Sequence, residues 1–349
     1  MRRLSKAGLG ILGVTALMLT QATPAHADHA PEAVDVVGVG SDTIQFAVNF
    51  LADGDYLGNP GVNSSGARVI NFDATGDANG KLTNGAGVVL RAGTVPVTRP
   101  NGTGGGINYM NNSDKGAVHK VQFARMSRPP SKAEDDAAAA NGWGGLHCYQ
   151  MALDGLKIAV SNQVTTNAGT NGISKADLVQ IFSATGTIRN WGQVSGWNGP
   201  GAAANTPIVP ILPPSTSGTE QFFIQQLGLT EAQVRADVVR AEEHDPSAIQ
   251  GNANAIAPFS TARIVMIHNG YFNNGTPLSS DPVKLLNAGF STTRPVYIVV
   301  RQSEVNQKWN KDLFAPGGFM STSFLAQPLI GDAAGFNYQY ADAGLCHTA

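Results

Sequence analysis

Two short segments rich in glycine, serine and threonine are the parts of the chain best suited to chemistry. Residues 38–43 read GVGSDT and residues 215–220 read STSGTE. Each follows a short apolar run typical of a strand and precedes a run typical of a helix. The first N–H groups of a helix lack partners, the helix dipole places positive potential there, and hydroxyl side chains add donors. Both segments therefore predict turns that could bind an oxyanion.

Simple helix capping is the alternative for each segment. Ser217 with Glu220 fits a capping box, in which the two side chains satisfy backbone N–H groups at the start of a helix. Two such turns in separate halves of one chain favour an anion-binding cleft over two independent caps. The candidate ligand residues in these turns are Ser41, Asp42, Thr43, Ser217, Gly218 and Thr219.

The sequence lacks the common signatures of catalysis. It has no Gly-x-Ser-x-Gly nucleophile motif, and its 7 histidines are scattered without the spacing of a metal pair. His244 and Asp245 are the one suggestive pair, and we interpret them as helix-end or surface residues. The net charge of −2 argues against a general nucleic-acid-binding protein. We therefore expect a protein that is not an enzyme and that binds no cofactor, metal or nucleic acid.

The N-terminus has the three parts of a secretory signal peptide. Basic residues stand at positions 2, 3 and 6, an apolar stretch covers residues 8–19, and a small-x-small sequence ends at Ala27. We expect cleavage after Ala27, which assigns residues 1–27 to the signal peptide. No cysteine lies at the cleavage point, so we expect a secreted or envelope-located protein without a lipid anchor. In an exported chain the two cysteines, Cys148 and Cys346, are expected to form one disulfide.

Strand-like and helix-like runs alternate along the rest of the chain, which predicts an α/β protein with largely parallel sheets covered by helices. Residues 131–140 open with Ser131 and Glu134, a capping box. Three segments rich in glycine and asparagine are expected to be loops, at residues 59–66, 73–87 and 101–113. The expected strands are residues 34–39, 68–72, 121–124, 157–161, 208–212, 263–268 and 296–300, and the expected helices are residues 43–51, 131–140, 174–182, 230–241 and 281–288.

Several segments together resemble the phosphate-binding proteins of bacterial ABC importers, the PstS type, within the type II periplasmic-binding-protein fold. Ser217-Gly218-Thr219 matches a Ser-Gly-Thr turn of that family, and residues 154–160 (DGLKIAV) are similar to its crossover strand. Residues 177–182 followed by Asn190-Trp191 resemble another of its segments. Residues 38–43 and 123–129 stand where the family has its first and second ligand loops.

The resemblance implies two α/β domains joined by crossover strands, with the ligand cleft between them. The first domain would be discontinuous, from residues 28–151 and 261–349, and the second would be the inserted residues 152–260. The function implied is an extracytoplasmic solute-binding protein that captures inorganic phosphate, or a similar oxyanion, for uptake through an ABC transporter permease. A monomer is expected.

Two positions depart from the pattern of that family. Pro213 stands where the family commonly has an arginine, and Ser127 stands where it has an aspartate. The resemblance therefore implies that Arg125 or Arg128 supplies the missing cation, with Arg125 and Ser127 among the ligand residues. Asp42 is then the nearest candidate for an acceptor that discriminates phosphate from sulfate, with Arg125 balancing its charge. An envelope interaction or sensing protein without tight anion binding, and a secreted phosphatase, are the alternative functions.

Overall fold

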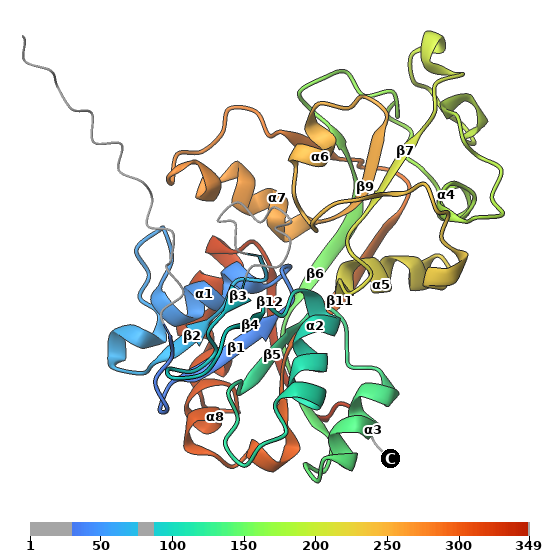
Figure 1. Cartoon of the computed structure of the whole chain (residues 1–349). Helices are drawn as coiled ribbons and strands as arrows, with labels where there is room; N and C mark the ends of the chain where they lie inside the picture. The colour runs from blue at the N-terminus through green and yellow to red at the C-terminus, as the bar shows by residue number, and fades with distance from the viewer. Residues whose placement is uncertain (1–29, 76–86, 348–349) are drawn as a thin grey trace, which may run out of the picture.

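The computed structural model of the chain describes residues 30–75 and 87–347. The signal peptide predicted at residues 1–27 lies outside the described residues. The centre of the fold is one large mixed sheet with the strand order β2-β1-β5-β11-β6-β9-β7-β8, and β10 and β12 also pair with β6 (Figure 1). Its strands are β1 (Val36–Gly40), β2 (Val69–Asn71), β5 (Phe123–Met126), β6 (Leu146–Ser161), β7 (Val209–Leu212), β8 (Val239–Arg240), β9 (Ala255–Ser260), β10 (Val283–Leu285), β11 (Ser291–Arg301) and β12 (Asn337–Leu345).

Helices pack on the sheet in both halves of the molecule (Figure 1). Among the described residues, no helix is long and apolar enough to span a bilayer. A small separate sheet pairs β3 (Gly87–Val88) with β4 (Val97–Thr98). The helices are α1 (Gln45–Asp53), α2 (Gly102–Asn108), α3 (Lys132–Ala140), α4 (Lys175–Phe182), α5 (Gly218–Gln226), α6 (Ser247–Gln250), α7 (Thr261–His268), α8 (Lys308–Leu313) and α9 (Ser323–Gln327).

The pairing of the strands differs from the largely parallel sheets expected from the sequence. The outer pairs are parallel, β1 with β2 and β5, and β7 with β8 and β9. The central pairs are antiparallel, because β11 runs against both β5 and β6, and β6 runs against β9. The chain crosses the molecule along β6, which has 16 residues, and returns along β11, which has 11. Alternating strand and helix patterns cannot predict this direction, because the two long strands pair directly with each other.

Two groups of hydrophobic clusters lie at the two ends of these long strands. The first-lobe clusters take residues from both ends of the chain, such as Phe46 on α1 and Phe336 near the C-terminus. The second-lobe clusters take residues from the middle, such as Trp191, Phe223 on α5 and Ile249 on α6. This is the mixed α/β architecture, with crossover strands joining two lobes, that the sequence predicted. The domain boundaries at residues 151 and 261 stay a prediction.

Seven of the twelve expected strands and helices lie within two residues of their predicted positions, whereas the strands predicted at residues 157–161 and 296–300 are only the C-terminal parts of the longer β6 and β11. The capping box at Ser131 and Glu134 is confirmed: the Ser131 side chain accepts from the Glu134 N–H, and the Glu134 carboxylate accepts from the Ser131 N–H. The disulfide between Cys148 on β6 and Cys346 after β12 is also confirmed, with 5.1 Å between the Cα atoms. It closes a loop across 198 residues and fixes the C-terminal strand against β6.

Four predicted elements are wrong. Residues 263–268, predicted as a strand, form α7, because the Ser260 side chain caps the helix and one helix face packs into the first-lobe core through Ala262 and Met266. Residues 230–241 form a short 3₁₀ turn and β8 instead of a helix. Residues 281–288 contain β10, because this segment pairs with β6 in spite of its helix-start signals. Residues 101–113, predicted as a loop, contain α2 despite its glycines.

Candidate functional site

The two hydroxyl-rich turns face each other between the lobes. The turn after β1 leads into α1 of the first lobe, and the turn after β7 leads into α5 of the second lobe. Thr43 Oγ1 lies 3.0 Å from Thr219 Oγ1, and both residues are buried. The structure thus brings together two turns that are 176 residues apart in the sequence, as an anion-binding cleft requires.

The carboxylate of Glu243 lies between these turns and accepts their hydrogen bonds. The Thr43 backbone N–H donates to Glu243 Oε1 at 2.9 Å and the Thr43 hydroxyl donates to the same oxygen at 2.8 Å. The Ser217 hydroxyl donates to Oε2, and Ser41 Oγ lies 3.5 Å from Oε1. We call these donors, from Ser41, Thr43 and Ser217, the anion seat. Its occupant is a carboxylate of the protein itself, that of Glu243.

Arg294 on β11 supplies the positive charge closest to the paired threonines. Its Nη2 donates to Thr219 Oγ1 at 2.7 Å and lies 3.4 Å from Thr43 Oγ1. Thr219 can then donate to Thr43, and Thr43 donates to Glu243, so one chain of hydrogen bonds runs from a guanidinium to a carboxylate. Hydrogen bonds in such a chain polarise one another and strengthen the last acceptor contact.

A buried carboxylate partner holds Arg294 in place. Asp154 on β6 accepts from Arg294 Nη2 at 2.9 Å and from the Ser260 hydroxyl at 2.6 Å. Both charged side chains are fully buried, and burial raises the pKa of Asp154 while Arg294 opposes the rise. Among the described residues, Arg294 Nη1 is buried without a hydrogen-bond partner. Arg263 Nε and Asp42 Oδ1 are also buried without a hydrogen-bond partner among the described residues, so the site contains several unsatisfied polar atoms.

Asp42 pairs with an arginine that the sequence analysis did not select. Arg263 Nη2 on α7 lies 3.0 Å from Asp42 Oδ2 and 3.2 Å from the Asp42 carbonyl oxygen. Burial raises the pKa of Asp42 to about 7, with Arg263 opposing the rise and Glu243 adding to it. The direct ion pair is with Arg263, while the expected partner, Arg125, also lowers the pKa of Asp42 through its charge, as the smallest of the named effects.

Arg125 and Arg128 both lie next to the two turns, but their guanidinium groups bind the protein's own acceptors, among them the Ser41 carbonyl oxygen for Arg125 and Gln221 Oε1 on α5 for Arg128. Arg125 is fully buried, and its guanidinium donates to the carbonyl oxygens of Ser41 and Gly40 and to Asn71 Oδ1. It supports the backbone of the first turn from behind. Arg128 pairs with Glu134 at 2.8 Å in the N-terminal cap of α3. The cation at the threonine pair is Arg294, which lies neither near Pro213 nor in the second loop.

Gly218 and Ser127 lie side by side where the lobes touch. A Cβ at position 218 would come within 2.4 Å of both Ser127 Oγ and Thr103 Oγ1, so only glycine permits this approach. The Ser127 N–H donates at 3.0 Å to Oγ1 of Thr103, which lies in the first turn of α2. The second ligand loop therefore contacts the α5 turn through a serine, and no carboxylate stands at this position.

The capping role predicted for Ser217 is present together with its contact to Glu243, but the capping box is incomplete, because neither carboxylate oxygen of Glu220 has a hydrogen-bond partner among the described residues. Ser217 Oγ accepts from the N–H groups of Thr219 and Glu220 at 3.1 and 3.2 Å. The same hydroxyl uses its proton to bind Glu243. Capping and anion binding are therefore compatible in one side chain, and the two interpretations of this motif are not exclusive.

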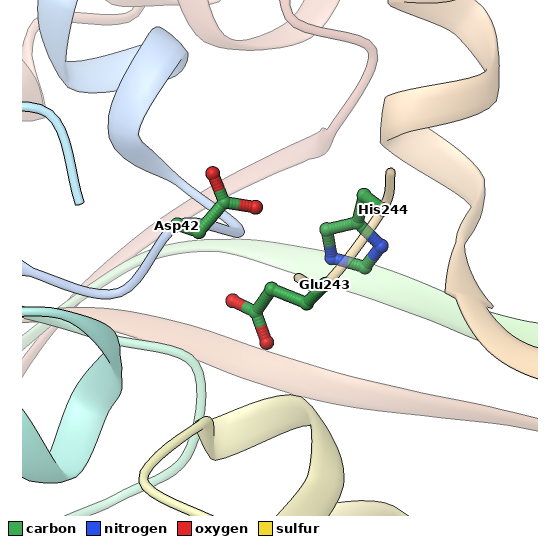
Figure 2. Close-up of side chains that lie close together, drawn as sticks. All are labelled: Asp42, Glu243 and His244. Atoms are coloured by element: carbon green, nitrogen blue, oxygen red, sulfur yellow. The ribbon is translucent and has the colours of Figure 1, made fainter. Parts of the chain in front are cut away.

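His244 lies at the site and not at the surface, which corrects its interpretation from the sequence. Asp42, Glu243 and His244 form a buried cluster whose ligand atoms lie within 4.8 Å of one another (Figure 2). Burial lowers the pKa of His244 well below its ordinary value. Its Nδ1 faces the Ser260 N–H at 3.3 Å and accepts from it, which places the proton on Nε2, the atom that faces Thr43. Asp42 is already paired with Arg263, and Glu243 already accepts from Thr43. These groups are therefore better suited to contacts within the protein than to binding a cation.

A cavity of about 310 Å³ adjoins this cluster and is lined on one side by His244 and Arg263. Its other walls include the apolar residues Ile267, Phe272 and Leu278. His244 thus lies against Thr43 of the anion seat and also lines this cavity, whose walls include polar residues such as Asp245 and Gln250.

The sequence analysis missed Glu243, Arg294 and Arg263 because each lies outside the two turns. Arg294 stands between Thr293 and Pro295, just before the apolar run at residues 296–300, and this local pattern gives no signal of a buried functional role. Glu242-Glu243-His244 follows β8 as a run of three ionisable residues that are all buried. Nothing in the sequence indicates how the two lobes align them.

The fold has two lobes joined by long strands, with a buried polar cluster between them. Residues 76–278 match the family model described as the PBP superfamily domain, and the chain belongs to that superfamily. A comparison with curated proteins gives no match.

Solved structures with the same fold carry names that refer to phosphate. An ABC-type phosphate transport receptor from Vibrio cholerae aligns with a TM-score of 0.52 and 16% identity over 87% of this chain and 100% of that chain. A putative phosphate ABC transporter substrate-binding protein with bound phosphate, from Clostridium perfringens, gives 0.54 and 15% over 87% and 100%. A human phosphate binding apolipoprotein gives 0.53 and 15% over 87% and 91%. At these identities the likeness shows the fold.

Proposed function

We propose that this chain is an extracytoplasmic receptor that binds inorganic phosphate, or a similar oxyanion, for uptake by an ABC transporter. The observation that carries the proposal is the seated carboxylate. Donors from both lobes already surround an oxyanion, the side chain of Glu243, through Thr43 and Ser217. A phosphate group offers the same kind of acceptor and could also engage the unsatisfied Nη1 of Arg294.

The names of the solved structures support phosphate as the ligand class. The transport receptor and the phosphate-bound protein listed above share this fold over nearly their whole length. The predicted signal peptide supports a location outside the cytoplasm, in the envelope or secreted. A transporter permease is the partner that such a receptor requires, and the proposal includes a monomer that delivers its ligand to that permease.

A receptor or sensing protein without tight anion binding is the second candidate, and the occupied seat is the observation that favours it. Glu243 fills the position a ligand would take, and Asp42 lies beside it with its pKa near 7. A phosphatase would need a nucleophile with a base, and the hydroxyls at this site lack a free histidine base because Nδ1 of His244 accepts from the backbone.

Calorimetry tests the proposal directly. The mature protein is titrated with inorganic phosphate, sulfate and an organic phosphate at one ionic strength. A dissociation constant for inorganic phosphate in the micromolar range or lower supports the receptor. No heat with any anion favours the sensing protein, and release of phosphate from the organic phosphate would identify a phosphatase.

A further inference from the structure

We infer that Glu243 is an internal competitor for the anion seat, and that ligand affinity and selectivity depend on its displacement. This inference rests on the proposed function and concerns its regulation by one residue of this chain. The side chain reaches from the second lobe, after β8, to Thr43 at the start of α1 in the first lobe. Glu243 is therefore a contact between the lobes as well as the occupant of the seat.

The hydrogen bonds show why Glu243 competes with a ligand and does not assist it. Both carboxylate oxygens are acceptors: Oε1 takes the N–H and hydroxyl of Thr43, and Oε2 takes the hydroxyl of Ser217. An added anion would find these donors occupied. It would also lie against the negative charge of Glu243, and like charges in contact are strongly unfavourable.

The surroundings do not neutralise this carboxylate. Arg294 is paired with Asp154, and Arg263 is paired with Asp42. Glu243 is held by neutral donors and by the polarised chain that begins at Arg294. An incoming oxyanion could also accept a hydrogen bond from Arg294 Nη1. This donor is not used by Glu243 and has no partner in the described part of the chain. Ligands with several charged oxygens should therefore displace Glu243 better than a simple monocarboxylate such as acetate.

The test compares Glu243→Ala and Glu243→Gln with Glu242→Gln. Glu242 is adjacent and buried, accepts from Asn101 Nδ2 at 2.9 Å, and lies outside the seat. Burial raises its pKa to about 8, so an amide is a close substitute at pH 7. Inorganic phosphate is titrated into each protein by calorimetry. In parallel, hydrogen exchange is measured at the Thr43 amide, which donates to Glu243.

We expect Glu243→Ala to bind phosphate at least about tenfold more tightly than the natural chain, since a like charge leaves the seat. Glu243→Gln should gain less, because the amide still fills the space, and Glu242→Gln should match the natural chain. Without phosphate, Glu243→Ala should exchange the Thr43 amide about tenfold faster or more, and phosphate should restore protection. Melting curves confirm that each variant is folded.

Two results would overturn the inference. One is unchanged or weaker phosphate binding by Glu243→Ala in a protein whose natural form binds phosphate, since Glu243 would then support the ligand. The other is unchanged Thr43 exchange in Glu243→Ala, since the seat would not be occupied in solution. If neither the natural chain nor any variant binds phosphate, the proposed function fails, and the exchange rate of Thr43 alone decides whether Glu243 holds the seat.

Discussion

The turn before α1 and the turn before α5 have the same residue types, yet they use their donors differently. In the first turn, the Thr43 N–H donates to Glu243 Oε1 at 2.9 Å and also to Ser41 Oγ within the turn at 3.2 Å, and the Thr43 hydroxyl donates to Glu243. In the second turn, the N–H groups of Thr219 and Glu220 donate to Ser217 within the same turn. The second turn meets the first lobe through the Thr219 hydroxyl, which lies against Thr43, and through the Thr216 carbonyl oxygen, which accepts from the Gly104 N–H.

Because of this difference, the two turns contribute different kinds of hydrogen-bond donor to the site. The first turn offers a backbone donor that no side-chain substitution can remove, while the second turn depends on hydroxyls alone. Substitutions in the second turn should therefore change ligand affinity more selectively than those in the first. Arg294 contacts a threonine from each turn, so its removal should affect both.

Replacing Arg294 should have the largest effect, because it removes the support common to both turns. In Arg294→Met the buried Asp154 loses its partner, and breaking a buried ion pair in this way costs about 3–5 kcal/mol of stability. Urea denaturation measures the loss. Lys132→Met, which breaks the exposed pair with Asp136, is the control and should cost about 1 kcal/mol or less. Equal losses in the two variants would contradict the central role given to Arg294.

A side chain at position 218 should separate the second turn from the first lobe. The Cβ of Gly218→Val would collide with Ser127 Oγ and Thr103 Oγ1, so the lobes could not close in their present arrangement. Phosphate affinity should fall by about a hundredfold, which corresponds to about 2.7 kcal/mol. Calorimetry checks this. The control is Gly251→Val, where a Cβ meets nothing within 4 Å, and affinity there should be unchanged. Tight binding by Gly218→Val would show that the ligand site does not lie between these loops.

The two turns were predictable from the sequence, whereas the residues that connect them were not. Gly-rich turns with Ser and Thr follow from local chemistry, and Thr43 and Thr219 lie together as expected. Glu243, Arg263 and Arg294 come from elements whose type or pairing depends on distant packing. Arg263 illustrates this, because its segment has the branched residues of a strand but forms α7 against the first-lobe core.

Arg125 shows the complementary limit of sequence reasoning. A basic residue in a ligand loop suggests a charge directed at a ligand. In the structure its guanidinium instead satisfies the carbonyl oxygens of Gly40 and Ser41, which the sharp turn would otherwise leave without donors. Local sequence identifies the loop, but only the folded backbone decides whether an arginine faces the ligand or the loop itself.

Thr219 and Ser217 should separate affinity from stability within the second turn. Thr219→Val keeps the shape but loses the hydroxyl that accepts from Arg294, so phosphate binding should weaken by about ten- to a hundredfold with little change in stability. Ser217→Ala also loses the cap of α5 and should cost about 1 kcal/mol of stability as well. Calorimetry and urea denaturation measure the two effects. Equal stability losses with unchanged affinity in both variants would mean that this turn only caps its helix.

The smallest effect concerns Glu220, a buried acid in the first turn of α5. Burial raises its pKa to about 9, although Arg240 lies 3.6 Å away and opposes the rise. The folded state therefore keeps a proton that the unfolded chain releases near pH 4.5. Stability falls as the pH rises from about 4.5 to 9, and it levels off above 9. Asp42 and Glu242 act in the same direction but complete their change near pH 7 and 8, so the decrease between pH 8 and 9 reports mainly Glu220.

Glu220→Gln, which stays neutral, should melt about 2 °C or more above the natural chain at pH 9 and close to it at pH 5. Calorimetric melting across this range checks the shift, with the exposed Asp136→Asn as the control that should follow the natural curve. A Glu220→Gln curve parallel to the natural one would mean that this carboxyl is already ionised inside the second turn, and the contrast between the two turns would then extend to their charge.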